Sequence, residues 1–234
     1  MAEQIGLARN FTLEWLDSAA NCQLAGKNKA EAREYLDCII GEKLHSKDNI
    51  RKTRTMMLNL WYDNEPWIQN VAIAAYRDAA HNEHLPLHWA MLLVYYPIFF
   101  DLSTVIGSLL EYREVITLQQ IRSRIYEKWG ARTTLEHSLS KNMQSLKDVG
   151  VLIPQQAVGT YTATKAVVDS KQIVYALANA IITNEKCEYM TWEEIIHHPA
   201  LFPFEIKHVT QADLAACDRF ALERMGDNVV IRMK

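Results

Sequence analysis

Cysteine is scarce in this chain, and none of it is paired in the way that a metal or redox site requires. The four cysteines, Cys22, Cys38, Cys187 and Cys217, are scattered without CxxC spacing. The absence of CxxC spacing argues against a cysteine-ligated zinc site. In a chain without a secretory signal, the scattered cysteines also argue against disulfides. We therefore expect the protein to work in a reducing cytoplasm.

The motifs that mark common enzyme classes are also missing. There is no GxGxxG, no Walker lysine loop, no HExxH and no DxD-type carboxylate pair. His81, His84 and His88 form an H-x2-H-x3-H run, but we expect Pro86 to interrupt any continuous helix between them, and no cysteine accompanies them. Helix-end and core histidines are the simpler interpretation. His197-His198-Pro199 has no recognisable nucleophile nearby, so we predict no enzyme, no metal and no cofactor.

No apolar run is long enough to cross a bilayer. The most apolar stretch, Leu85 to Phe100, is too short for a span and contains His88 and Pro97. We predict that it forms one buried central helix, with Asp101 capping a further helix that ends near Tyr112. No membrane partner is expected.

What is present is the composition of an ordinary globular protein. The chain has 234 residues, 49% of them apolar and 23% charged, which is enough to bury a full core. No internal repeat, low-complexity run or linker stands out, so we expect the halves of the chain to pack together. The first 115 residues read as helical, with predicted helices at Phe11–Ala25, Asn28–Leu44, Ser46–Trp61 and Pro66–His81.

The stretch from Thr117 to Lys165 has the pattern of two helices followed by a β-hairpin. Thr117 with Gln120, and Thr133 with Glu136, have capping-box spacing, and Gly130 lies in the turn between the two predicted helices. Gly150 ends the second helix. The β-like residues that follow are Val151–Ile153 and Thr160–Thr164, separated by a loop from Pro154 to Gly159.

This segment resembles the winged-helix family of DNA-binding domains over roughly 50 residues, through Thr117–Trp129, Gly130–Arg132, Thr133–Asp148 and the Val149–Leu152 exit. The resemblance implies that the second helix enters the DNA major groove, although winged helices also serve as protein-interaction modules. A fainter resemblance is to the BrxA-type small subunits of bacterial BREX phage-defence systems. It is carried by His88-Trp89, Tyr95–Asp101, Trp129-Gly130 and Leu146–Leu152.

Charge is distributed unevenly along the chain. The net charge is −3, yet Val115 to Lys171 contains eight basic residues against four acidic ones. A basic window in an acidic chain is what a phosphate-facing surface would look like, and a solvated mixed-charge face is the alternative. The other basic cluster, on the predicted third helix, comprises Lys47, Arg51, Lys52 and Arg54. We interpret it as a solvated helix face rather than a nucleic-acid surface.

Helical geometry identifies the residues expected to meet DNA. Leu135, Leu139, Met143 and Leu146 are expected to face the core. Because successive residues of a helix are 100° apart, His137, Lys141 and Gln144 then lie on the opposite face, which is exposed to solvent. Asn142 falls near the apolar stripe and fits it poorly, while Glu136 and Asp148 would repel phosphates. The candidate nucleic-acid-binding residues are Arg124, Lys128, Arg132, Thr133, His137, Ser140, Lys141, Gln144 and Lys165.

The tail is predicted to mix helices and strands. We expect helices at Lys171–Asn184 and Thr210–Met225, a short helix capped by Thr191, and strands at Phe204–Val209 and Asn228–Met233 that pair with each other.

The whole is then mainly α: a helical domain (1–115), a winged helix-turn-helix (116–170) and a helical C-terminal extension with a strand pair (171–234). The predicted function is non-catalytic binding of double-stranded DNA, as a regulator or as a component of a BREX-like system. The alternative is a scaffold whose winged helix binds other proteins or subunits.

Overall fold

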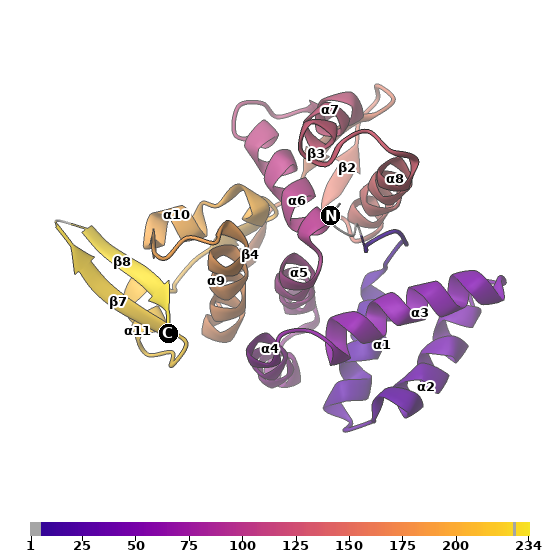
Figure 1. Cartoon of the computed structure of the whole chain (residues 1–234), viewed down its shortest axis with the longest axis horizontal. Helices are drawn as coiled ribbons and strands as arrows, with labels where there is room; N and C mark the ends of the chain where they lie inside the picture. Colours follow the sequence, from indigo (N-terminus) through magenta and orange to yellow (C-terminus); the bar gives the residue numbers. More distant parts are fainter. Residues whose placement is uncertain (1–5, 227) are drawn as a thin grey trace.

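A computed structural model describes residues 6–226 and 228–234 and shows a mainly α-helical protein with small sheets near its C-terminal half. The first four helices are α1 (Leu13–Leu24), α2 (Lys29–Gly41), α3 (Lys47–Tyr62) and α4 (Pro66–Asp78). Their starts agree with the sequence signals: Asn28 forms the predicted capping box with Glu31, and Pro66 occupies the first turn of α4. In Figure 1, α1, α2 and α3 form a group at one end of the molecule.

The predicted central helix, Leu85–Phe100, is in fact two helices. A 3₁₀ turn (η1, His81–Glu83) leads into α5 (His84–Tyr95), and α6 (Pro97–Leu110) follows at an angle of 117°. The break occurs because the residue before a proline is driven out of the α conformation, and Tyr96 is indeed extended. Asp101 therefore lies inside α6 and does not cap a new helix. In the described chain no single helix is both long and apolar enough to cross a membrane.

The segment predicted as helix–turn–helix–hairpin has that order. Strand β1 (Ile116–Thr117) precedes α7 (Leu118–Trp129), Gly130 adopts a positive φ in the turn, and α8 (Thr133–Asp148) leads to β2 (Leu152–Pro154) and β3 (Thr160–Ala163). The three strands form an antiparallel sheet in the order β1-β3-β2. We call α6 to β3 the first unit.

One capping box in the first unit is present and the other is not. Thr117 and Gln120 satisfy each other's backbone donors as predicted. The predicted box between Thr133 and Glu136 is wrong, because α8 starts one residue earlier, with Arg132 at the N-cap position. Glu136 instead pairs with Arg122 on α7, at 2.6 Å between Oε1 and Nη2. The carboxylate of Glu136, which would have completed the capping box, thus forms an ion pair between α7 and α8 instead.

The C-terminal third contains more β structure than predicted. Its elements are β4 (Ala166–Val168), α9 (Lys171–Glu185), β5 (Met190–Thr191), α10 (Trp192–Ile196), the 3₁₀ turn η2 (Pro199–Leu201), β6 (Phe204–Ile206), α11 (Gln211–Ala215), β7 (Phe220–Met225) and β8 (Asn228–Met233).

Two predictions for this region are wrong. The helix expected over Thr210–Met225 is limited to the short α11; a turn follows it, and Phe220–Met225 forms strand β7, paired with β8. The strand at Phe204 does not pair with the terminal strand. It pairs in parallel with β4, while β8 lies between β5 and β7. Both outcomes depend on partners distant in sequence, which local propensity does not report.

The order of elements in the first unit recurs in the tail, from α9 to β8. Helix α9, strand β5, helices α10 and α11 and the β7–β8 hairpin follow one another, with η2 and β6 inserted, and the sheet order β5-β8-β7 matches β1-β3-β2. The match is closest where each short strand enters its helix. Ile116–Ile121 (ITLQQI) and Met190–Ile195 (MTWEEI) both place a capping-box threonine at the junction. The chain thus contains a structural repeat that its sequence reveals only over these six residues.

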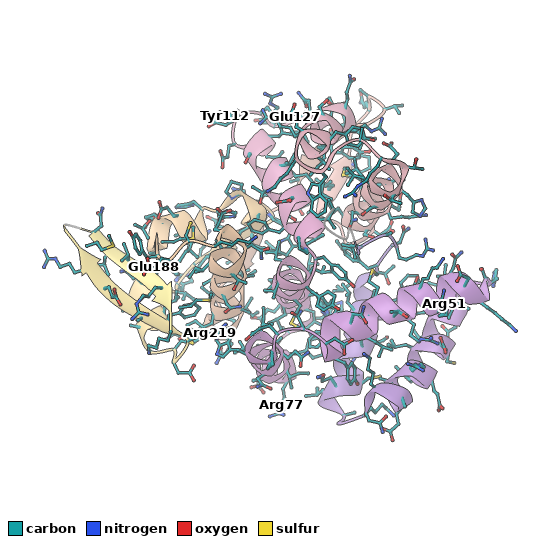
Figure 2. The ribbon with its side chains drawn as sticks, in the orientation of Figure 1. Arg51, Arg77, Tyr112, Glu127, Glu188 and Arg219 are labelled. Atoms are coloured by element: carbon teal, nitrogen blue, oxygen red, sulfur yellow. The ribbon has the colours of Figure 1, made fainter. Side chains whose placement is uncertain are left out.

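A shared core joins the parts. Helices α5 and α9 lie side by side in the middle of Figure 1. Trp89 on α5 is fully buried, makes edge contacts with Phe99, Phe202 and Phe204, and donates its Nε1 hydrogen to the carbonyl of Ala200, 2.9 Å away. Arg219 binds Glu65, the N-cap residue of α4, and Asn179 of α9, and Figure 2 shows it between α4 and the C-terminal hairpin.

Candidate nucleic-acid interface

Helix α8 turns the predicted apolar stripe inward. Leu135, Leu139, Met143 and Leu146 are all buried, with at most 3% of their surface exposed. The helical phase predicted from the sequence is therefore confirmed, and the outward face of α8 contains the polar residues that the phase predicted.

A second face of α8, polar and not expected from the sequence, is buried as well and binds the segment before α1. Ser138 and Asn142 both donate hydrogen bonds to the carbonyl oxygen of Leu7, at 3.0 Å from the Asn142 amide, and Ser145 Oγ accepts from the amide of Phe11 at 2.8 Å. These side chains hold the segment before α1 against α8. Asn142 is thus no misfit, since its amide satisfies a buried carbonyl. The signal was the polar spacing of Ser138, Asn142 and Ser145 beside the apolar stripe.

The outward face of α8 carries most of the predicted contact residues. Thr133, His137 and Ser140 are exposed, and Lys141 and Gln144 are partly buried. Two of the five have neighbours that hold them: His137 Nε2 lies 3.3 Å from Arg9 Nη1, and the Gln144 amide donates to Asp148 Oδ1 at 2.7 Å. Gln144 would have to give up that bond to read a base edge.

A chain of three hollows runs along this face, and we call it the α8 groove. The first lies between α3 and the start of α8, and Arg9, Arg51, Lys52 and His137 are among its lining residues. The second shares Arg9 and reaches Lys141. The third shares Lys141 and extends past Ser140 and Gln144 to Lys147, with Arg122 and Glu136 at its side.

The lining of the α8 groove is strongly basic. Among residues 6–226 and 228–234, the charged groups that line it are Arg9, Arg51, Lys52, Arg122, Lys141, Lys147 and, as the single acid, Glu136. Three of these cations have nearby counter-charges. Arg122 pairs with Glu136 at 2.6 Å, and Arg51 and Lys52 both pair with Asp48, at 2.7 and 2.6 Å. The two Asp48 pairs are exposed on α3, so solvent and salt screen them. Lys141 and Lys147 make no ion pair with any residue in the described part of the chain.

Half of the groove comes from outside the window identified in the sequence. Arg9 precedes α1, and Arg51 and Lys52 belong to the cluster that we interpreted as a solvated face of α3. In Figure 1 the indigo segment before α1 lies between α3 and α8, and Figure 2 labels Arg51 on α3. The fold therefore adds these cations to the surface of α8.

The remaining predicted cations lie elsewhere. Lys128 Nζ is held 2.6 Å from Oδ1 of Asp101, a buried carboxylate that also accepts from Trp129 Nε1 at 2.7 Å. Arg124 is exposed on the opposite flank of α7, in a hollow shared with Arg113. Arg132 is the partly buried N-cap residue of α8. None of these three side chains lines the α8 groove.

Lys165 lines a separate cavity between α6, β3 and η2. Glu111, Glu114 and His198 share that cavity, so its charge is mixed. Burial lowers the pKa of His198, and Glu185, whose Oε1 lies 3.1 Å from its Nε2, acts in the opposite direction. The structure thus separates Lys165 from the residues of α8 with which the sequence analysis grouped it.

In comparisons with protein-family models, curated proteins and solved structures, none matches this chain. A function for the chain therefore has to be argued from its own geometry and charge.

Proposed function

We propose that this chain is a non-catalytic double-stranded DNA-binding protein of the winged-helix type, with α8 as the helix that meets the duplex. The observation that carries the proposal is the α8 groove, whose described lining has six basic residues and one acidic residue. A basic surface of this kind attracts the phosphate backbone and releases its counterions.

The architecture of the first unit supports the winged-helix assignment. A helix, a short strand, two helices joined at Gly130 and a two-stranded hairpin follow in the order typical of winged helices, with the first strand beside the third. Helix α8 has 16 residues, about 24 Å at 1.5 Å per residue, and its outward stripe of small polar side chains suits a groove about 12 Å wide.

The charges favour contact with the backbone over reading of bases. Four of the groove's cations, Arg9, Arg51, Lys52 and Lys147, flank the outward stripe of α8, and Gln144 is already bonded to Asp148. The loop of the hairpin, from Gln155 to Val158, has no charged side chain to grip a phosphate. We therefore expect affinity for duplex DNA with little sequence preference.

Fluorescence anisotropy with a labelled duplex tests the proposal. Binding should be micromolar or tighter at low salt, with a slope of log K against log[salt] of about −3 to −6, at roughly −0.9 per phosphate neutralised. Absence of binding at low salt would exclude the proposal and favour a scaffold whose first unit binds proteins.

Matched single substitutions locate the surface. Arg9→Ala and Lys141→Ala should each weaken binding to all duplexes and make the salt slope shallower by about one. Lys165→Ala and Arg124→Ala remove the same charge outside the α8 groove, so they should change little. Equal losses in all four variants would place the DNA away from the groove.

The resemblance to BrxA-type subunits adds a further expectation, that the protein works within a phage-defence assembly. Affinity purification from a host that carries the neighbouring genes would test it. Recovery of the chain without any product of those genes would instead favour a regulator that acts alone.

A further inference from the structure

A cluster of histidines surrounds one carboxylate on α1, and none of these residues lines the α8 groove. Asp17 of α1 is met by His81 of η1 and by His84 and His88 of α5. His84 Nδ1 lies 3.0 Å from Asp17 Oδ1, and His81 Nδ1 lies 3.8 Å from Asp17 Oδ2. One ligand atom from each of Asp17, His81 and His84 fits within 4.8 Å of the others. The fold thus supplies the carboxylate partner that the histidine run lacked in the sequence.

Pro86 does not separate the histidines as we expected. It occupies the first turn of α5, where a missing N–H costs little, so the helix runs through it from His84 to His88. His84 and His88 therefore project one turn apart from the same face of α5, toward Asp17.

One nitrogen of each of the three histidine rings lies close to the Asp17 carboxylate, and the buried Nδ1 of His88 has no hydrogen-bond partner among the described residues. His88 is fully buried, and its Nε2 lies 2.8 Å from Asp17 Oδ1, in position to donate. His84 Nδ1 is buried and near the same oxygen, yet it makes no hydrogen bond with any residue in the described ranges. The His81 ring is 77% exposed and still directs Nδ1 to the second oxygen. Two imidazole nitrogens and a carboxylate oxygen thus lie within 4.8 Å of one another.

These atoms have the chemistry and the spacing of a transition-metal site. Zinc binds imidazole nitrogen at about 2.0–2.1 Å and carboxylate oxygen at about 2.0–2.2 Å, which places tetrahedral ligand atoms about 3.3 Å apart. The distance from His84 Nδ1 to Asp17 Oδ1 is 3.0 Å and that from His81 Nδ1 to Asp17 Oδ2 is 3.8 Å, on either side of that value. Rotation of the exposed His81 side chain can close the remaining gap.

The surroundings hold two of the ligands in place. Tyr76 lies against the His84 ring, with centroids 4.2 Å apart, and His88 holds the carboxylate from behind. A hydrogen-bonded partner behind a ligand is the usual support of such sites.

We propose that Asp17, His81 and His84 bind one divalent transition-metal ion, of which zinc is the type, with His88 as a positioning residue behind Asp17. Three protein ligands leave a fourth position for water. The ion would join α1 to the start of α5, two elements more than 60 residues apart in sequence. It would stabilise the folded chain by mass action. This site is independent of the proposed DNA binding.

Calorimetric titration of the untagged, chelator-treated full chain with zinc chloride tests the site. We expect one ion per chain, micromolar or tighter affinity and a raised melting temperature. Titration with cobalt(II) should give the visible absorption of a tetrahedral nitrogen–oxygen site.

The decisive variant is His81→Ala, because an exposed ring can be removed without disturbing the fold. It should weaken zinc binding at least tenfold, as should His84→Ala. His197→Ala removes an exposed histidine far from the cluster and should leave binding unchanged. Circular dichroism of each variant without metal confirms that it is folded. Failure of the wild-type chain to bind zinc, or equal binding by His81→Ala and wild type, would overturn the proposal.

Discussion

Replacing Gly107 by alanine should destabilise the protein, against the usual effect of that substitution in a helix. Gly107 lies within α6, where alanine is ordinarily better than glycine by about 1 kcal/mol. Here a Cβ would lie 2.0 Å from the carbonyl oxygen of Pro199 and 2.8 Å from its Cα. Those are backbone atoms of η2, so no side chain can rotate away to make room.

The size of the effect follows from the movement required. Carbon and oxygen atoms need well over 3 Å between them, so η2 or α6 would have to shift by roughly 1 Å or more. Overpacking costs about 1–3 kcal/mol, and a contact of 2.0 Å with backbone atoms belongs to the upper half of that range, above the helix-propensity gain of about 1 kcal/mol. We expect a net loss of about 1–2 kcal/mol and a fall in melting temperature of about 2–8 °C for a chain of this length.

Gly41→Ala provides the matched control. Gly41 is the last residue of α2, and a Cβ there would meet only Ile50 Cδ1, at an ordinary 3.9 Å. Its expected effect is a gain of about 0.4–1 kcal/mol. Urea unfolding followed by circular dichroism and by tryptophan fluorescence gives both free energies. If Gly107→Ala were as stable as wild type or more so, the close contact between α6 and η2 would be wrong, and with it the packing of the two repeated units.

Two further predictions concern the core of the first unit and the acid sensitivity of the tail. Leu139→Ala should lower the free energy of unfolding by about 2–5 kcal/mol because Leu139 is buried, whereas Lys141→Ala, on the opposite face of α8, should change it by no more than about 0.5 kcal/mol; comparable losses in thermal melts would refute the phase of α8. Asp213 is held by Lys171 and by Thr210, which lower the pKa of its carboxyl to about 2. A carboxyl whose pKa is lowered on folding stabilises the folded state. The full contribution is present at pH values above the ordinary carboxyl pKa of 3.8, and it is lost as the pH falls toward 2. Asp213→Asn should therefore be less stable than wild type at pH 7, and the two denaturation midpoints should converge between pH 4 and pH 2; a constant difference across that range would contradict this origin.

Local chemistry in the sequence predicted many of the elements. Capping boxes at Asn28, Thr117 and Thr191 and the proline at position 66 each begin a helix where expected. These signals are reliable because a cap satisfies backbone donors within a few residues and needs no distant partner.

Predictions failed where a distant partner competed with the local signal. Glu136 pairs with Arg122 across two helices instead of capping its own, and the segment after Ala215 forms a strand because β8 is beside it. Pro97 was a local signal that we misjudged, since the turn it forces comes at Tyr96 and not at Asp101.

The candidate sites show the same division. Sequence periodicity alone determined which face of α8 is apolar, because a regular helix fixes the angle between residues that are close in the chain. Only the tertiary structure decided that Arg9, Arg51 and Lys52 would join that helix in one groove, and that Lys128 and Lys165 would not. Asp17 likewise meets His81 and His84 only because α1 packs beside the start of α5. Ion pairs and metal coordination require atoms within a few ångströms of each other. Separation along the sequence does not determine which side chains come that close, because that depends on how the helices pack.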